Sequence, residues 1–281
     1  MERGRKSLCS KVMSFMLAAV MMVSVIGIMP ESVSAAEKSI ASKGGSVAIT
    51  DAECSYATSE YTWIQYTPKA DGYIKLTFAP NSAVVSYPEG TAQLYNKTKS
   101  KALSDVFSFF TDDNRQVFKS DYYGVKKKTT YYIRVTSYGG VNVNIKFVKF
   151  KDKSGTKQSK AITLKKGKQT TGVMTAGSNK AHWYKFNMSK PSKLSFFITP
   201  FTTGDVSVTL KGPGSNNTIS GTVRCRSYQY NYDGSVNVTG NYWGRKYTCY
   251  ESSRLHRTGM YYVQIKPTTK TGTGYYKISW K

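Results

Sequence analysis

The sequence has few of the side chains that catalysis and metal binding usually require. It contains two histidines, and 16 Asp and Glu residues against 41 Lys and Arg residues. No Cys-x-x-Cys pair and no Cys/His cluster at zinc spacing occurs. No Gly-x-Ser-x-Gly elbow occurs either, and the second half offers only Asp205, Asp233 and Glu251 as orienting acids. A histidine-centred hydrolytic triad and a zinc site are therefore not expected.

The chain also lacks helical periodicity after its first 36 residues. Those 36 residues have the pattern of a signal peptide: a basic start, an apolar run over residues 13–29, and small residues at 33–36. Cleavage after Ala35 or Ala36 is favoured over an uncleaved anchor, because the small-residue site follows at the right distance. No second apolar span follows, so we expect a mature chain without a membrane span, secreted and held at the cell wall by charge.

Acidic residues are scarcest in the second half of the chain. Residues 37–155 contain 17 basic and 11 acidic residues, a net charge of +6, whereas residues 156–281 contain 20 and 3, a net charge of +17. The positive electrostatic potential of such a surface favours anionic partners. Scattered lysines are also found on an ordinary solvated surface. Nucleic-acid modules are missing and the leader exports the chain. An anionic cell-wall polymer, a glycan or a host extracellular protein is therefore the expected partner, and nucleic acid is not.

A tryptophan-centred unit occurs twice. The unit of Trp63 and the strand of Ile74 recur at Trp183 and Leu194, each 120 positions later. Later matches are 130 and 133 positions apart, which places the extra length in loops between matched strands. The pattern predicts a duplicated domain, with repeat 1 over residues 37–152 and repeat 2 over residues 153–281, joined at a linker near 151–160.

Short alternating strands separated by turns predict the fold class. Tyr73–Phe78 and Val141–Phe147 alternate with period two, and turn signals separate the strands. We therefore expect an all-β protein of two tandem antiparallel β-sandwiches, jelly-roll-like, after a signal peptide. His182 is expected to face solvent. The expected core consists of Trp63, Tyr66, Ile74, Leu76 and Phe78 in repeat 1, and Trp183, Phe186, Leu194, Phe196 and Ile198 in repeat 2.

Repeat 2 resembles a known bacterial family. The motifs at His182–Phe186, Leu194–Ile198, Val208–Leu210 and Gly259–Ile265 are similar to those of the pre-peptidase C-terminal (PPC) β-sandwich domain, and repeat 1 is a weaker copy. The resemblance implies a jelly-roll-like sandwich with an accessory or binding role. Some relatives, the collagen-binding modules of clostridial collagenases, bind calcium and collagen. No catalytic domain accompanies the repeats here, which departs from the usual arrangement.

Cysteines and acidic pairs leave two structural alternatives open. Cys225 and Cys249 either form a disulfide in an oxidising exterior or remain thiols, and Cys54 is left over. Asp112 and Asp113 are weak calcium candidates, but a polar turn explains them more simply. No other cofactor is expected.

The insertion over residues 215–257 is the candidate binding site. Arg224, Arg226, Tyr228, Tyr230 and Tyr232 share one strand parity, so a strand would place them on one face. If Cys225 faces Cys249 in an antiparallel pair, Tyr228 lies opposite Lys246 and Tyr232 opposite Tyr242. The competing topology is a hairpin turning at Asp233-Gly234, which separates the cysteines. The full candidate set is Arg224, Arg226, Tyr228, Tyr230, Tyr232, Tyr242, Trp243 and Lys246.

These patterns lead to two functional hypotheses. The first is a secreted, non-catalytic binding or adhesion protein that acts at the cell surface or matrix through this basic, tyrosine-rich repeat. Packing of the tyrosines within a sheet is the plainer explanation of the same stripe. The alternative hypothesis is an accessory domain pair of an exported hydrolase, or a degenerate hydrolase using His256 and Glu251.

Overall fold

The chain folds into two β-sandwiches that repeat one strand order. The computed structural model describes residues 35–50, 53, 60–81, 89–109, 120–214, 218–225, 228–230, 236–238 and 243–281. The leader before Ala35, Cys54, Asp112 and Asp113 lie outside these residues. Helical structure in the described part is confined to short 3-10 turns such as η2 (Gln158–Lys160). No described helix is long and apolar enough to cross a membrane. The predicted all-β fold class is confirmed.

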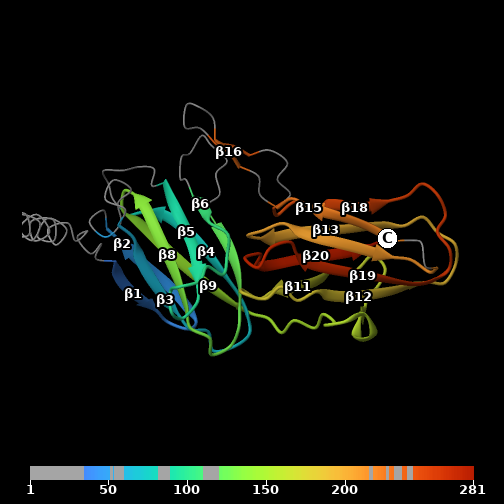
Figure 1. Cartoon of the computed structure of the whole chain (residues 1–281), viewed down its shortest axis with the longest axis horizontal. Helices are drawn as coiled ribbons and strands as arrows, with labels where there is room; N and C mark the ends of the chain where they lie inside the picture. The colour runs from blue at the N-terminus through green and yellow to red at the C-terminus, as the bar shows by residue number, and fades with distance from the viewer. Residues whose placement is uncertain are drawn as a thin grey trace, which may run out of the picture. The chain divides into compact units, whose positions relative to one another are not determined.

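The first sandwich pairs a five-stranded with a four-stranded sheet (Figure 1). The orders are β1-β3-β8-β5-β6 and β2-β9-β4-β7. The strands are β1 (Ala36–Ile40), β2 (Gly44–Ile49), β3 (Thr62–Tyr66), β4 (Gly72–Pro80), β5 (Glu89–Tyr95), β6 (Phe107–Phe109), β7 (Ser120–Val125), β8 (Tyr131–Tyr138) and β9 (Val141–Lys149).

The second sandwich repeats both strand orders position by position. Its sheets run β10-β12-β19-β14-β15 and β11-β20-β13-β18, and β16 pairs with β17 outside them. The strands are β10 (Ile162–Thr163), β11 (Thr170–Met174), β12 (His182–Met188), β13 (Ser195–Thr202), β14 (Val206–Lys211), β15 (Thr218–Val223), β16 (Tyr228–Tyr230), β17 (Val236–Val238), β18 (Tyr247–Glu251), β19 (Gly259–Pro267) and β20 (Gly274–Trp280).

One pairing in each sandwich departs from the expected antiparallel pattern. The edge strands β1 and β10 pair in parallel with β3 and β12, respectively. β1 and β2 are joined by a short turn yet belong to opposite sheets. The chain therefore crosses between layers at once, and β1 cannot form a hairpin with its neighbour in sequence.

Each sandwich encloses its own apolar core between its two sheets. Alternate residues of β4 and β13 are buried, as their period-two pattern predicts. The predicted core residues other than the tryptophans belong to these clusters: Tyr66, Ile74, Leu76 and Phe78 in the first sandwich, and Phe186, Leu194, Phe196 and Ile198 in the second.

The tryptophan of each repeat is buried, as predicted, but it lies on the outer face of its five-stranded sheet and not in the core between the two sheets. Ile64 and Tyr66 of β3 are fully buried in the first core, so Trp63 between them points to the other face. Trp183 stands in the same relation to the core residue Tyr184 of β12. Both tryptophans are nonetheless buried, at 7% and 9% exposure. These strands carry apolar residues on both faces, which is why apolar pattern did not fix their orientation.

His182 turns inward, which contradicts its predicted solvent exposure. It shares the parity of the core residue Tyr184, and its side chain is 12% exposed. A hydrogen bond of 2.7 Å links its Nδ1 to the hydroxyl of Tyr276, whose hydroxyl lies 2.7 Å from that of Tyr184. Asp152 Oδ2 lies 3.7 Å from the same Nδ1. Burial lowers the pKa of His182 against the opposing field of Asp152, and burial raises the pKa of both phenols.

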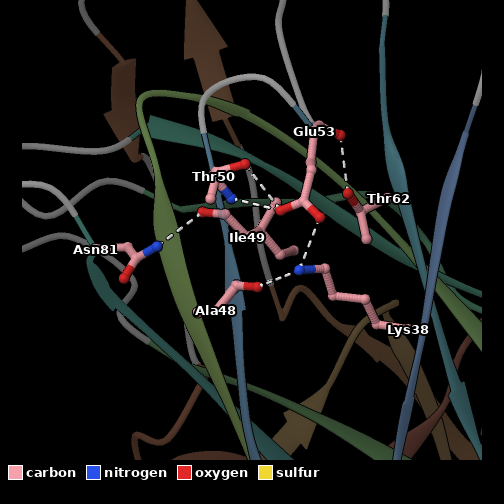
Figure 2. Close-up of polar contacts among 7 residues, drawn as sticks. All are labelled: Lys38, Ala48, Ile49, Thr50, Glu53, Thr62 and Asn81. Atoms are coloured by element: carbon pink, nitrogen blue, oxygen red, sulfur yellow. Dashed lines mark hydrogen bonds and ion pairs between the residues drawn. The ribbon is translucent and has the colours of Figure 1, made fainter.

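A polar cluster joins the ends of the first strands. Figure 2 shows the Glu53 carboxylate accepting hydrogen bonds from the backbone N–H and hydroxyl of Thr50, at 2.8 and 2.9 Å. Lys38 Nζ lies 2.8 Å from the same carboxylate and donates to the carbonyl of Ala48. Thr62 donates to the Glu53 carbonyl. The Lys38 ammonium holds the pKa of Glu53 below its usual value, so this cluster ties β1, β2 and β3 together most firmly when Glu53 is ionised.

Gly124 of strand β7 in the first sandwich contacts the second sandwich. Gly124 forms an isolated bridge with Thr175, donates its N–H to Thr273 Oγ1 at 3.0 Å, and accepts from the N–H of Ala176 at 2.8 Å. A Cβ atom at this position would lie 2.1 Å from the carbonyl oxygen of Met174. The backbone approach at this junction therefore requires glycine.

Candidate functional site

The insertion of the second sandwich leaves and rejoins the fold at a closed neck. β16 and β17 form a hairpin in which Tyr228 pairs with Val238, so the competing hairpin topology is the observed one. Tyr228 therefore does not lie opposite Lys246, which the alternative with Cys225 facing Cys249 would require. The neck is closed by the N–H of Trp243, which donates to the carbonyl of Cys225 at 3.2 Å. A hydrogen bond of 2.7 Å from the N–H of Gly244 to the carbonyl oxygen of Pro200 anchors the returning chain on β13.

Cys225 and Cys249 are not joined by a disulfide, so the thiol alternative is the observed one. Cys225 is buried in the second core, where its sulfur accepts a hydrogen bond from Thr202 Oγ1 at 3.2 Å. Cys249 lies in β18, at the edge of the other sheet. Burial raises the pKa of the Cys249 thiol to about 12. Cys225 thus follows β15 of one sheet, Cys249 lies in β18 of the other, and the Cys249 thiol is protonated at neutral pH.

A row of aromatic rings and lysines covers the outer face of the four-stranded sheet of the second sandwich. Phe196 and Ile198 of β13 point into the core, so Phe197 and Phe201 point outward. We call this surface the lysine–aromatic face. It consists of Phe197, Phe201, Trp243, Lys246 and Lys277.

Each lysine of this face lies close to a ring. Lys246 Nζ is 3.8 Å from the centroid of Phe197, and Lys277 Nζ is 5.9 Å from that of Phe201. Trp243 packs edge-on against Phe201, with centroids 5.6 Å apart. These distances fall in the range where an ammonium is attracted to a ring. The rings are half-buried and Lys246 is exposed, so the charges are positioned without being removed from water.

The rings continue onto the first sandwich. Tyr275 of β20 stacks on Phe201 and on Tyr73, with centroids 4.4 Å apart in both pairs. Tyr122 lies 5.6 Å from Trp243, and Lys75 Nζ lies 5.9 Å from the Tyr122 centroid. Burial raises the pKa of Tyr73, Tyr122 and Tyr275, so the phenols stay neutral and the lysines supply the charge.

The described acids of the second repeat are engaged elsewhere. Asp205 accepts the N–H of Cys225 at 2.9 Å, and Glu251 accepts a hydrogen bond of 3.4 Å from Ser195. Within the described residues, no salt bridge involves Lys246 or Lys277. The face therefore presents positive charge to solvent without an ion-pair partner among these residues.

The structure brings together only part of the predicted site. Trp243 and Lys246 belong to the lysine–aromatic face, and Arg224 is exposed beside Cys225. Tyr228 and Tyr230 lie in β16. Arg226, Tyr232 and Tyr242 lie outside the described residues. Sequence reasoning missed Phe197, Phe201 and Lys277, although Phe197 and Phe201 gave a signal as apolar residues on the second face of β13.

The alternative catalytic pair is not assembled. His256 Nε2 lies 2.8 Å from the hydroxyl of Tyr250, whereas Glu251 accepts a hydrogen bond from Ser195. No hydrogen bond or ion pair joins His256 to Glu251 in the part of the chain that is described. Among the same residues, no group of three or more His, Cys, Asp or Glu side chains is placed to hold a metal ion.

An open cleft of about 620 Å³ adjoins the linker. Its charged lining is mixed, with Asp71 and Asp152 facing Lys126, Lys151 and Lys180 around the same space. This mixture gives the cleft no clear preference for one sign of ligand, in contrast to the lysine–aromatic face.

Comparison with known proteins leaves the family open. No protein-family model matches the chain, and no curated protein matches it. Solved structures that resemble it include tripeptidyl peptidase 2, at 7% identity and a TM-score of 0.26, covering 84% of this chain and 22% of that one. The CBM22 tandem domain of Paenibacillus barcinonensis Xyn10C has 10% identity and a TM-score of 0.25, covering 77% and 80%. The CUB1-EGF-CUB2 region of human MASP-1/3 has 8% identity and a TM-score of 0.22, covering 85% and 100%. Similarity this low carries no argument about function.

Proposed function

We propose that this protein is a secreted, non-catalytic binding protein that attaches to an anionic polymer of the cell surface or extracellular matrix. The observation that carries the proposal is the lysine–aromatic face, where Lys246 lies 3.8 Å from the Phe197 ring and Lys277 lies beside Phe201. The net charge of +17 over residues 156–281 adds long-range attraction for the same class of partner. The predicted leader and the PPC resemblance agree with this role.

The polymer would be held by two kinds of contact. Ammonium groups fixed over rings attract phosphate or carboxylate groups, while the half-buried rings offer flat apolar surface to the polymer backbone. Because exposed charges are screened by salt, binding carried by this face should weaken as salt rises. A glycan and an anionic wall polymer both satisfy this chemistry, and a host protein would need an acidic surface.

The test is retention of the full chain on purified bacterial cell walls across a salt series. The decisive variant is Lys246→Gln with Lys277→Gln. Each exposed charge contact is worth about 0.5–1 kcal/mol, so the double variant should bind about five- to thirty-fold more weakly. The matched control is Lys185→Gln with Lys266→Gln, which removes the same charge from the outer face of the other sheet.

Three results would count against the proposal. These are no wall binding at low salt, binding that salt does not weaken, and equal losses in the two double variants. Equal losses would mean that net charge, and not the lysine–aromatic face, drives attachment.

A further inference from the structure

The first sandwich carries a second arrangement of rings and cations that is separate from the lysine–aromatic face. It lies on the outer face of the sheet β1-β3-β8-β5-β6, around the outward-pointing Trp63. We call it the Arg134 face. It consists of Tyr61, Trp63, Tyr95, Lys99, Tyr132 and Arg134.

Arg134 is held between two rings. It stands in β8, directly opposite Trp63 in the strand pairing. Its guanidinium carbon lies 5.7 Å from the centroid of Tyr61 and 5.3 Å from that of Tyr95. Among the described residues, the Arg134 guanidinium forms no hydrogen bond or ion pair, whereas its backbone pairs with β3 and β5. A half-exposed guanidinium fixed by rings keeps its planar set of donors for a further partner.

The other charges of this face already neutralise each other. Lys99 Nζ lies 2.5 Å from the carboxylate of Glu37, and this pairing lowers the pKa of Glu37. Lys99 also lies over the rings of Tyr132 and Trp63, at 4.4 and 5.5 Å. One positive charge, that of Arg134, is therefore left over, which matches one sugar unit with a single negative charge.

Trp63 supports the face from beneath. Its ring meets those of Tyr61, Tyr95 and Tyr132 edge-on, with centroids 5.5, 5.1 and 6.1 Å apart. Gln65 donates to the Tyr132 hydroxyl at 3.1 Å. The tyrosine rings are thus fixed before any ligand arrives, which reduces the entropy cost of binding.

The second sandwich provides an internal comparison. Its strand pairing places Gln264 opposite Trp183, where the first sandwich has Arg134 opposite Trp63. Lys211 takes the place of Tyr95, and its ammonium lies 5.6 Å from the Trp183 centroid. The supporting tryptophan is kept in both repeats, whereas the arginine and its flanking ring are present in the first only.

We propose that the Arg134 face binds a carboxylated sugar unit, such as a uronic acid within a polysaccharide. The planar guanidinium matches a carboxylate through two parallel hydrogen bonds, whereas a divalent phosphate would need a second unneutralised cation. The flanking tyrosines offer apolar ring surface to a pyranose, and their hydroxyls remain polar at its edge. The inference does not depend on the proposed function, since it concerns another face of another sandwich.

The experiment measures binding of trigalacturonic acid to the full chain by calorimetry, with maltotriose as the neutral trisaccharide of equal length. The wild type should bind the acidic sugar and bind maltotriose at least tenfold more weakly. Arg134→Gln should lower affinity for the acidic sugar about tenfold or more, because a charge-assisted hydrogen bond is lost. Arg134→Lys should lose most of that affinity too, because lysine keeps the positive charge but lacks the planar pair of N–H donors that matches a carboxylate.

Further variants separate this site from general charge and from misfolding. Lys185→Gln with Lys266→Gln, which removes two charges from a face outside both proposed sites, should leave binding of trigalacturonic acid unchanged. Far-ultraviolet circular dichroism and thermal melting of the Arg134 variants should match the wild type. The inference is overturned by wild-type binding that does not distinguish the two trisaccharides or is absent at millimolar sugar. Full affinity in Arg134→Lys, or tighter binding of a sulfated trisaccharide of equal charge, would overturn it as well.

Discussion

The buried hydroxyl chain of the second sandwich gives a sharp test of its core. Tyr276 is its middle member, with His182 Nδ1 on one side and the Tyr184 hydroxyl on the other, each at 2.7 Å. Tyr276→Phe keeps the ring and removes the hydroxyl that serves both neighbours. A buried polar group that loses its partner costs about 1–3 kcal/mol, so two such losses amount to about 2–6 kcal/mol.

Tyr184→Phe provides the matched comparison. It removes the end of the same chain and leaves Tyr276 bonded to His182, so it should cost about 1–3 kcal/mol, as one such loss does. When Tyr184→Phe is already present, Tyr276→Phe should cost less than it does alone, because the Tyr184 hydroxyl is no longer there to lose its hydrogen-bond partner.

Hydrogen exchange followed by mass spectrometry is the suitable assay, since it resolves the two sandwiches within one chain. Peptides from β12 and β20 should lose protection in the variants, while peptides from β3 and β9 serve as an internal reference. A cost below about 1 kcal/mol for Tyr276→Phe, or equal and additive costs for the two variants, would refute a connected chain.

The remaining predictions concern the junction and the pH response. Gly124→Ala places a Cβ 2.1 Å from the Met174 carbonyl oxygen and disturbs two hydrogen bonds worth about 1 kcal/mol each, so the melting temperature should fall. A Cβ at Gly221 would meet no atom within 4 Å, so Gly221→Ala should leave the melting temperature unchanged. Equal melting temperatures of the Gly124→Ala and Gly221→Ala variants would contradict the close backbone approach at Gly124. Burial lowers the pKa of His182 in the folded chain. Below about pH 6.5 the unfolded chain therefore binds a proton more readily than the folded chain does, and the free energy of unfolding decreases as the pH is lowered. Denaturant titrations at pH 8 and pH 5 should show a smaller loss in His182→Gln, and an unchanged loss would exclude His182 as the source.

The fold was predictable where one face of a strand is apolar and the other is not. β4 and β9 alternate cleanly, so their buried faces followed from the sequence, and their extents did so to within two residues at each end. β3 and β12 do not, because Trp63 lies beside Ile64 and Trp183 beside Tyr184, and both faces read as apolar. A one-residue error in parity moves every side chain to the other face. That is why the tryptophans were placed in the core and His182 was placed in solvent.

The candidate site was predictable only in part because its residues meet through pairing. Lys246, Phe197 and Lys277 come from segments far apart in the sequence. The pairing of β13 with β20 and with β18, which Lys246 directly precedes, brings them onto one face. The same holds for Arg134, which strand pairing places opposite Trp63. The composition indicated a basic second half, but the net charge of a segment cannot identify a single arginine in the nearly charge-balanced first half.

The closed neck at Cys225 and Trp243 has a consequence for how this protein can change. The chain leaves the sandwich and returns to it at adjacent points, so the segment between them can vary in length without moving a strand of the core. Doubling the length of such a loop costs only about 0.6 kcal/mol in closure entropy. The neck is therefore a natural place to graft a foreign sequence, and a place where related chains could diverge while the sheet beneath them is preserved.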